Sequence, residues 1–567
     1  MQEKMKKTSV RIACAQINST VGDLQGNSGK ILAAIELARA KAADVICFPE
    51  LALTGYPPED LLFKPKFIED NLLQIKELAS SVKDITAIVG FVDRSGKDLY
   101  NAAAIISGGR IRAVARKMSL PNYGVFDEDR YFKPGKKPLV FALEGRDSKV
   151  ILGVNICEDI WDKHGPLNSQ AAQGAELIFT INASPFHAGK IRQREALIRR
   201  QAAANRAAIA YTNLVGGQDE LVFDGQSMIV DSRGLVRRRG RAFAEDLLIE
   251  DIPVKSAARI PENMIVLGGD FDAKNKDKLE RPGLKPLSGV EETYKALVLG
   301  VRDYVLKNGF KKVVIGLSGG IDSSLVAVLA ADALGKDNVA GVFMPSRYSS
   351  RASETDAAVL ARNLGIEFKN ISIDYIYKIY LLALEPHFAG RERDIAEENL
   401  QARIRGNLLM AFSNKFGWLV LTTGNKSEMS TGYATLYGDM AGGFAPIKDV
   451  PKILVYQLCR WRNSLKEVIP EGVLTKAPTA ELRPNQKDSD SLPPYGTLDP
   501  ILKAYVEDDR SISRIVKSGF AGETVNKVAG LVDHSEYKRR QSAPGIKITP
   551  RAFGKDRRMP ITNKYRG

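Results

Sequence analysis

Short apolar runs, each long enough for one buried strand, alternate along most of the chain with amphipathic stretches of helical length. The alternation stops at Gly268–Gly289, which is rich in Gly, Pro, Asp and Lys and has little apolar periodicity, and it resumes at Glu291. Strands that alternate with helices are typical of α/β domains. The pattern therefore predicts α/β domains at 1–265 and 291–567, joined by a linker at 266–290.

No apolar run approaches the roughly 18 residues that a membrane-spanning helix needs. The basic start, Met1–Arg11, leads into the strand-like run Val10–Ala15 without a long apolar core, which argues against a signal peptide. The four scattered cysteines provide neither a disulfide framework nor a CxxC pair for zinc or redox chemistry. They are Cys14, Cys47, Cys157 and Cys459. These features predict a cytoplasmic protein that does not act at a membrane.

The composition is that of a folded protein, with 44% hydrophobic and 26% charged residues, but the net charge is +15. Residues 1–270 carry 37 Lys and Arg against 33 Asp and Glu, whereas residues 271–567 carry 45 against 34. The excess fits a solvated surface with a basic tail at Gly545–Gly567, a phosphate-rich ligand, or nucleic acid. No zinc finger, RNP motif or basic zipper supports nucleic acid.

Three apolar runs in the first half each end in a residue capable of chemistry: Glu50, Lys117 and Cys157. Groups at the carboxyl ends of strands can converge on one cleft. A carboxylate beside a thiol can accept its proton, and an ammonium stabilises both the thiolate and the oxyanion of a tetrahedral intermediate. The three residues together predict amide cleavage through a thioester.

Each of the three residues also has a structural explanation when taken alone. Cys157 fits a small buried apolar side chain, Glu50 after Pro49 fits a cap, and Lys117 fits a solvated charge. The surrounding sequence favours catalysis over these alternatives.

The first half, from about Val10 to Pro261, resembles the nitrilase superfamily and, within it, the glutaminase domains. The resemblance is carried by FPELALTGYPPEDLL (48–62), ARKMSLPNYGVFDEDRYF (115–132), VNICEDIW (154–161), NASPFHAGK (182–190) and GGQDELVFDGQSM (216–228). It implies a four-layer α-β-β-α sandwich.

By position, the resemblance makes Glu50 the general base, Lys117 the partner of the oxyanion and thiolate, and Cys157 the nucleophile. Its glutamine-binding positions correspond to Tyr123, Ser184 and Lys190, and a second carboxylate that helps to hold the site corresponds to Glu128. Some relatives have Arg at position 190, where Lys offers a point charge instead of a bidentate fork.

The second half contains KKVVIGLSGGIDSSLVAVLAADAL (311–334), a strand, a glycine-rich turn and a helix. Its glycines allow close approach of the backbone, whose N–H groups at the helix start can hold phosphate oxygens. Ser318, Ser323 and Ser324 add hydroxyl donors. A carboxylate at Asp322 beside phosphates calls for a cation between them, which indicates Mg²⁺.

Two other interpretations of the turn remain on the motif alone. GLSGG also satisfies GxSxG, the nucleophile elbow of α/β-hydrolases, with Ser318 as nucleophile and His534 as the following histidine. A structural glycine-rich turn is the other. No GxxxxGK[ST] motif is present. The longer form SGGIDSS favours phosphate, because a hydrolase has no use for Asp322 and the paired serines.

SGGIDSS resembles the loop of ATP pyrophosphatases of the adenine nucleotide α-hydrolase type, which implies a Rossmann-like, doubly wound parallel sheet. Three further segments resemble NAD synthetases. They are ENLQARIRGNLLMAFSN (398–414), LVLTTGNKSEMSTGYATLYGDMAGGFAPIKDVPK (419–452) and EYKRRQSAPGIKI (536–548). With the first half attached, nearly the whole chain resembles the family of glutamine-dependent NAD⁺ synthetases.

The resemblance also implies roles for residues of the second half. ATP is expected at Gly316, Leu317, Ser318, Gly319, Gly320, Ile321, Asp322, Ser323 and Thr423. Deamido-NAD is expected at Asn399, Glu428 and Lys538. Asp322 and Glu428 are the expected Mg²⁺ carboxylates, with ATP as co-substrate.

The implied reaction is ATP-dependent amidation of deamido-NAD through an acyl-adenylate, with ammonia supplied by glutamine and an internal passage for it. Glutamate, AMP and pyrophosphate are the by-products, and the step is the last of NAD⁺ biosynthesis. A homodimer or larger homo-oligomer is expected, without nucleic acid. Three alternatives remain: a related glutamine-dependent ligase with another acceptor, a nitrilase or amidase with a nucleotide-sensing domain, and a basic nucleic-acid protein.

Overall fold

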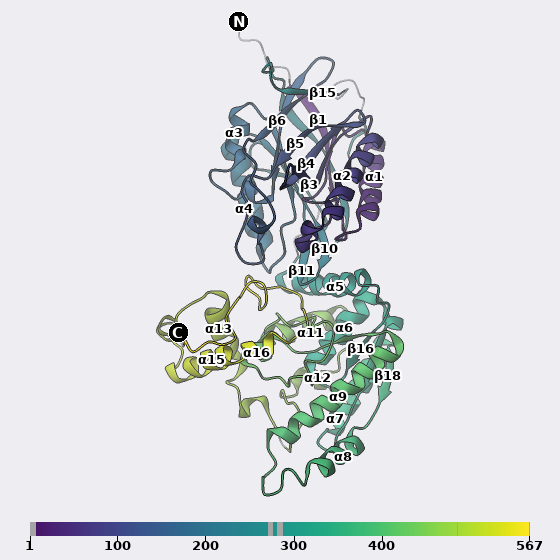
Figure 1. Ribbon diagram of the computed structural model, residues 1–567, viewed down its shortest axis with the longest axis vertical. Helices are drawn as coiled ribbons and strands as arrows, with labels where there is room; N and C mark the ends of the chain where they lie inside the picture. Colours follow the sequence, from purple (N-terminus) through teal and green to yellow (C-terminus); the bar gives the residue numbers. More distant parts are fainter. Residues whose placement is uncertain (1–6, 270–275, 280–286, 485, 566–567) are drawn as a thin grey trace. The chain divides into compact units, whose positions relative to one another are not determined.

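The computed structural model describes residues 7–269, 276–279, 287–484 and 486–565 (Figure 1). The chain forms two compact units. One comprises Met1–Gln218 with Val222–Pro286, and the other Asp219–Leu221 with Leu287–Gly567. The predicted linker at 266–290 begins inside β15 (Ile265–Gly268) and ends just after the start of α5 (Gly289–Lys307). Most of the sequence between these elements lies outside the described residues. Among the described helices, none is both long and apolar enough to cross a membrane.

Two large sheets form the centre of the first unit. In sheet order, the first contains β14 (Asp246–Lys255), β1 (Lys7–Gln16), β2 (Val45–Cys47), β3 (Thr86–Ser95), β4 (Asp98–Ser107) and β5 (Arg110–Arg116). The second contains β13 (Val236–Arg239), β12 (Met228–Val230), β9 (Ala208–Asn213), β8 (Leu177–Asn182), β7 (Lys149–Ile156), β6 (Leu139–Glu144) and β15. A hairpin, β10 (Val215–Gln218) and β11 (Leu221–Asp224), follows β9.

The core of this unit lies between the two sheets, where Ile12 and Val45 of the first sheet share one apolar cluster with Phe141 and Leu177 of the second. Helices cover the outer faces (Figure 1). The first sheet carries α1 (Leu24–Ala40) and α2 (Pro65–Ser81), and the second carries α3 (Pro166–Ala172) and α4 (Lys190–Asn205). This arrangement confirms the predicted α-β-β-α sandwich.

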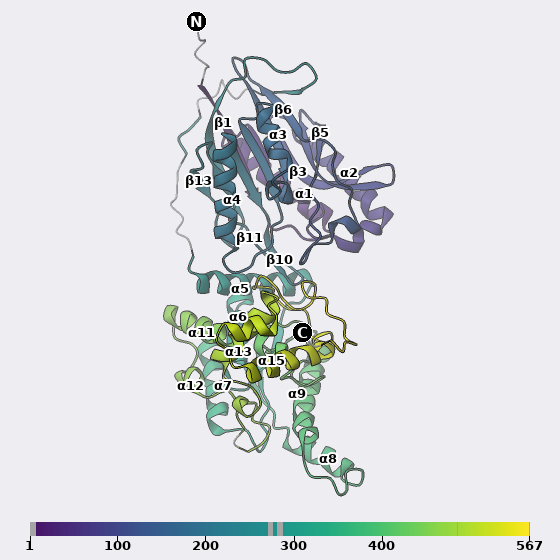
Figure 2. The same ribbon diagram turned by 90° about the vertical axis from the view of Figure 1, so that its left-hand side faces the viewer.

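A four-stranded parallel sheet organises the second unit. Its order is β18 (Glu367–Asn370), β17 (Val339–Phe343), β16 (Val313–Gly316) and β19 (Leu419–Leu421). Val314 and Val420 of the sheet pack against Leu409 of α9 (Ile395–Phe416). Further helices that contact the strands are α6 (Ile321–Leu334) and α7 (Arg351–Leu364), with α5 and α11 (Lys452–Leu465) packed on α6 (Figure 2). The predicted Rossmann-like parallel sheet is confirmed.

The remaining elements of this unit are short. They are α8 (Asp374–Leu384), α10 (Lys426–Thr431), α12 (Glu471–Thr475), α13 (Tyr495–Leu502), α14 (Ile512–Lys517), α15 (Gly522–His534) and α16 (Glu536–Arg539). The basic end of the chain, predicted as a tail, contains no described helix or strand, yet Ile546, Ile548 and Thr549 are buried. The first part of this segment is therefore packed into the unit, whereas most residues from Gly554 to Tyr565 are exposed.

Candidate active sites

The three residues at the predicted strand ends of the first unit meet. Lys117 directly follows β5, and its Nζ lies 2.7 Å from Oε1 of Glu50, which follows β2 by three residues. The same Nζ lies 2.8 Å from Oε1 of Glu128. Cys157 directly follows β7 in the other sheet. The charges of Glu50 and Lys117 act on the pKa of its thiol. All four side chains are buried.

Backbone geometry holds Glu50 and Cys157 in place. The segment of Glu50 passes so close to β3 that a Cβ on Gly90 would lie 2.3 Å from the carbonyl oxygen of Pro49. Cys157 has a φ of 47°, a left-handed conformation that is strained for a residue with a side chain. Strain of this kind at a buried thiol is typical of a functional turn, because the surrounding structure must hold it.

Hydrogen bonds orient the Glu50 carboxylate. Its Oε1 accepts from Nδ2 of Asn101 at 2.7 Å as well as from Lys117, and its Oε2 accepts from the backbone N–H of Ala183 at 2.9 Å. Oε2 accepts one hydrogen bond among these contacts, so it has a further lone pair with which it can accept a proton. Lys117 likewise uses two N–H groups on Glu50 and Glu128 and keeps a third for another acceptor.

Burial and charge set the ionisation of this centre. Burial, followed by the negative charge of Glu50, raises the pKa of Cys157 well above its ordinary value. The resting thiol is therefore protonated and needs a base. Burial opposes the charge on Lys117, but the attraction of Glu128 and Glu50 is larger, and its pKa is raised. Burial also raises the pKa of Glu128 to about 7 against the opposing effect of Lys117.

The predicted glutamine-binding residues surround the same centre. The hydroxyl of Tyr123 donates to both carboxylate oxygens of Glu158 at 3.1 Å. Lys190, at the start of α4, places Nζ 5.0 Å from the ring centroid of Trp161, and its positive charge also acts on Glu158. Ser184 is buried, and its backbone N–H donates to Asn213. Glu158 was absent from the predicted set, although it is the neighbour of Cys157.

Two supporting carboxylates were also missed. Asp159 accepts from the backbone N–H groups of Met118 and Ser119 at 3.0 and 2.8 Å, and so ties the chain after Lys117 to the turn after Cys157. Both carboxylate oxygens of Asp224 accept from Nη1 of the buried Arg194 at 3.0 Å. The same guanidinium also donates to the hydroxyl of Ser184. The partners named here lie 30 to 41 residues from these carboxylates in the chain.

In the second unit, the glycine-rich turn lies between β16 and α6. Gly319 has a φ of 74°, and a Cβ there would lie 2.3 Å from the carbonyl oxygen of Ser353. The hydroxyls of Ser318 and Ser323 lie 3.1 Å apart. β17 flanks β16 on one side and β19 on the other, so the turn stands at a switch point of the sheet, where α/β folds bind ligands.

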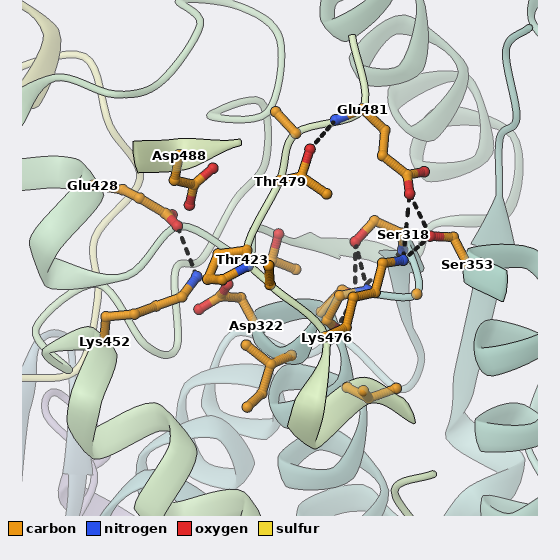
Figure 3. A pocket seen from close by; sticks show the side chains of 18 of the residues that line it. Ser318, Asp322, Ser353, Thr423, Glu428, Lys452, Lys476, Thr479, Glu481 and Asp488 are labelled. Atoms are coloured by element: carbon orange, nitrogen blue, oxygen red, sulfur yellow. Dashed lines mark hydrogen bonds and ion pairs between the residues drawn. The ribbon is translucent and has the colours of Figure 1, made fainter. Parts of the chain in front are cut away.

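Two cavities border this turn. One of about 170 Å³ is lined by Ser318–Ser323, Thr423, Glu428 and Lys452. Another of about 230 Å³ is lined by Gly316–Ser318, Thr423 and more apolar residues of the strand ends. Every predicted ATP residue therefore lines one cavity or both. Figure 3 shows that Lys476 and Glu481, which were not predicted, reach towards Ser318 and Ser353.

A lysine joins the two predicted metal carboxylates. Nζ of Lys452 contacts Oδ2 of Asp322 and lies 3.2 Å from Oε1 of Glu428 (Figure 3). Asn425 caps α10 and donates to Oδ1 of Asp322 at 2.9 Å. Burial, reinforced by Asp322 and Asp488 and opposed by Lys452, raises the pKa of Glu428 to about 8.

The donor set fits Mg²⁺. Among the described residues, no cluster of three His, Cys, Asp or Glu could hold a metal by itself. Mg²⁺, however, commonly takes one or two carboxylates and completes its shell with water and substrate phosphates. Asp322 and Glu428 line the cavity beside the glycine-rich turn and already share one cation, the Lys452 ammonium.

The remaining predicted residues converge on one loop. Asn399 on α9 accepts from the hydroxyl of Thr435 at 2.7 Å. Lys538 on α16 donates to the carbonyls of Gly432 and Ala434 at 2.8 and 2.9 Å, and burial lowers its pKa. Asn399 and Lys538 thus hold this loop from two helices, although they lie 36 and 104 positions from it in the sequence.

The geometry does not support the α/β-hydrolase alternative. The Ser318 hydroxyl accepts from the backbone N–H of Gly320 and pairs with Ser323. His534 lies on α15, where Nδ1 contacts the carbonyl of Gly530 at 2.7 Å. The described residues thus show no Ser318–His534 pair.

Two family models match the chain. The model described as carbon-nitrogen hydrolase matches residues 11–262, and the model described as NAD synthase matches residues 293–542. Two relatives named glutamine-dependent NAD(+) synthetase align with almost the entire chain. The protein of Thermotoga maritima is 50% identical over 98% of this chain and 99% of its own length. The protein of Aquifex aeolicus is 47% identical over 98% of this chain and 100% of its own.

Solved structures agree with these matches. The glutamine-dependent NAD⁺ synthetase from Acinetobacter baumannii in complex with adenosine diphosphate is 41% identical, with a TM-score of 0.75 over 98% of this chain and 99% of that one. A glutamine-dependent NAD(+) synthetase from Cytophaga hutchinsonii has the same fold, with a TM-score of 0.81 at 24% identity over 98% of both chains.

Proposed function

The chain belongs to the family of glutamine-dependent NAD⁺ synthetases, and on that premise we propose how its two sites divide the reaction. The enzyme is a carbon–nitrogen ligase that converts deamido-NAD to NAD⁺ with ATP and takes the amide nitrogen from glutamine. We assign glutamine hydrolysis to Glu50, Lys117 and Cys157, and the ATP-dependent step to the cavity beside the glycine-rich turn. The meeting of the Lys117 ammonium with Glu50 next to a strained thiol carries this assignment.

In the first site, the sulfur of Cys157 attacks the γ-amide carbon of glutamine as its proton moves to Oε2 of Glu50. The third N–H of Lys117 donates to the oxyanion, whose charge is stabilised strongly because the site is buried. Glu50 then returns the proton to the departing ammonia, and a thioester remains. Water, deprotonated by the same carboxylate, cleaves the thioester to glutamate.

In the second site, the nicotinate carboxylate of deamido-NAD attacks the α-phosphorus of ATP and displaces pyrophosphate. The N–H groups of the turn at 318–323 and the Lys452 ammonium face the phosphates and stabilise charge as it develops. Ammonia then attacks the acyl carbon of the adenylate and displaces AMP. Asn399 and Lys538 support deamido-NAD binding by shaping the loop at 432–435.

Mg²⁺, held by Asp322 and Glu428, supplies positive charge to the polyphosphate when bound. The chain prepares for it in two ways. Asn425 fixes the orientation of the Asp322 carboxylate, and Lys452 keeps both carboxylates close together before the metal arrives.

We propose a second copy of this chain as the macromolecular partner, bound through an apolar patch on α8 and α9. The patch comprises Tyr375, Ile379, Leu382 and Ile395, which are all exposed, and α8 lies at the periphery of its unit in both views (Figures 1 and 2). Positions 375, 379 and 382 have the spacing of one helix face. An exposed apolar face of this kind favours association, and family resemblance indicates a homodimer.

Replacement of the proposed nucleophile tests the division of labour. Cys157→Ala removes the sulfur that forms the thioester, so we expect glutamine-driven NAD⁺ synthesis to fall by at least about 10⁴-fold while ammonia-driven synthesis persists. Coupled assays of pyrophosphate release with glutamine or ammonium chloride measure both. Loss of both activities in a folded variant would contradict separate sites.

A further inference from the structure

A second buried lysine, Lys426, lies beside the ATP-dependent site without lining either cavity that borders the glycine-rich turn. It is the first residue of α10, between the cap Asn425 and the carboxylate of Glu428. Its ammonium has four oxygen partners in the described structure. They are Oδ1 of Asp449 at 2.9 Å, Oε1 of Glu507 at 2.7 Å, Oγ1 of Thr549 at 2.7 Å and the carbonyl of Arg551 at 3.1 Å.

These partners come from separate segments. Asp449 precedes Lys452 by three residues and also accepts from the backbone N–H groups of Ile548 and Thr549, both at 2.8 Å. Glu507 ends the short helix Lys503–Glu507. The ammonium therefore joins the start of α10 to the segment before Lys452 and to the last part of the chain.

The connections continue to the metal carboxylates. The side chain of Asn425 accepts from the N–H of Glu428 at 3.0 Å and donates to Asp322 at 2.9 Å. A change at the first residue of α10 therefore moves the cap and the carboxylate together. On the other side, the Asp449 segment leads directly into the residue whose ammonium bridges both carboxylates.

We propose that Lys426 is a positioning residue for the Mg²⁺-dependent step, which sets the separation of Asp322 and Glu428 through α10 and the Asp449 segment. The proposal rests on the proposed function of this site. A buried ammonium with two carboxylates is costly to desolvate and is a weak source of stability, but it fixes one arrangement of the segments that it joins. Residues that orient metal ligands from outside the coordination shell commonly affect metal affinity strongly.

The test compares Lys426→Met with Lys547→Met in the full chain. Lys547 is also buried and belongs to the same final segment, but its ammonium contacts Asp556 and the carbonyls of Thr549 and Pro550. In the described structure its ammonium contacts neither α10 nor the Asp449 side chain. Both variants lose a buried ion pair, and circular dichroism melting measures the loss of stability that they share.

Metal binding is measured directly by electron paramagnetic resonance of Mn²⁺ with α,β-methylene-ATP, a non-hydrolysable analogue. We expect Lys426→Met to weaken Mn²⁺ binding roughly tenfold and to raise the half-saturating Mg²⁺ for ammonia-driven pyrophosphate release to a similar extent. Lys547→Met leaves both quantities unchanged. Wild-type Mn²⁺ binding in Lys426→Met, or equal weakening in both variants, would overturn the positioning role.

Thr549→Val is the milder second variant, because it removes one hydroxyl partner of the ammonium and keeps the shape. It shifts Mn²⁺ binding in the same direction by a smaller factor, and it decides the question alone if Lys426→Met does not fold. A wild-type enzyme that released pyrophosphate without Mg²⁺ would contradict the proposed function of the site, whereas wild-type Mn²⁺ binding in both variants would contradict only the role of Lys426.

Discussion

The Lys117 ammonium is the group around which the buried centre of the first unit is built. Its two short contacts hold Glu50 and Glu128 at one cation, and burial raises the pKa of Glu128 to about 7. Tyr56 donates to Glu128 at 3.1 Å and favours the ionised form of that carboxyl. The chemistry near neutral pH therefore depends on a phenol that contacts neither the thiol nor the base in the described structure.

Removal of this phenol shifts the pH dependence of glutamine hydrolysis. Ionised Glu128 shares the Lys117 ammonium, so activity is expected to fall as the pH drops through about 7. Tyr56→Phe removes a donor to the charged form, which raises the pKa of Glu128 further and moves the acid limb upward by about one unit. The pH profile of kcat/KM measures the limb. Tyr131→Phe, whose hydroxyl donates to Asp60, is the control, and an unmoved midpoint in Tyr56→Phe would refute the link.

Lys190 is the residue-scale test of substrate recognition. It lies beside Trp161 and its charge acts on Glu158. If this charge meets the α-carboxylate of glutamine, Lys190→Ala raises the KM for glutamine by at least about tenfold. Lys190→Arg keeps a cation and retains most of the affinity. Steady-state kinetics with glutamine and then ammonia separate the effects, since ammonia-driven synthesis stays constant. An unchanged KM for glutamine would exclude the contact.

The sequence predicted the three residues to which we assign glutamine hydrolysis, but it did not predict the residues that support them. Glu50, Lys117 and Cys157 were expected together because each follows a strand, and the carboxyl ends of strands share an edge. Their meeting is observed, although their roles remain proposals. Asn101 lies within a strand, and Asp159 lies one turn after Cys157, so neither position gave such a signal. Each side chain becomes a hydrogen-bond partner of the site only when distant segments of the chain pair.

At the scale of elements, the turn between β16 and α6 depends on one glycine. Gly319 combines a positive φ with close contact to the start of α7, so neither the conformation nor the space admits a side chain. The sequence predicted this element well, since strand, glycines and helix are contiguous. The six-residue α10 was less accessible, because its position depends on contacts with residues more than 100 positions away.

Gly319→Ala tests the turn. The added Cβ would overlap the Ser353 carbonyl, displace the N–H groups and lower ATP-dependent synthesis by roughly 100-fold, since small misplacements are that costly. Ammonia-driven pyrophosphate release measures the loss. Gly309→Ala is the matched control, because Gly309 has a φ of 80° with nothing within 4 Å of an added Cβ. Equal losses in both variants would mean that backbone strain, and not the contact, is responsible.

At the scale of the whole molecule, the chain forms two compact units, and the first residues of its basic end are buried in the second of them. Seven basic residues with one acid suggested an extended or tail-like segment. The structure instead pairs Lys547 with Asp556 and binds the backbone of Thr549 to Asp449. A local charge count could not anticipate an acid 100 residues upstream.

Self-association through the patch of Tyr375, Ile379, Leu382 and Ile395 is the whole-molecule prediction. Charges at its centre would be buried without partners in a dimer, so Tyr375→Glu with Ile395→Glu raises the dissociation constant by roughly thirtyfold or more. Sedimentation velocity over a range of concentrations measures the change. Leu37→Glu, at an exposed position on α1, leaves association intact. A double variant that assembles like the wild type would place the interface elsewhere.

The buried end of the chain has a consequence for synthesis on the ribosome. The sheets that carry Glu50, Lys117 and Cys157 are complete by β15, whereas the ammonium of Lys426 lacks two of its oxygens until Thr549 and Arg551 have been translated. A nascent or prematurely terminated polypeptide therefore completes the unit of Glu50, Lys117 and Cys157 before the unit that contains Lys426. Proteolytic removal of the final residues would likewise take two oxygen partners from Lys426 and leave the sheets of the first unit complete.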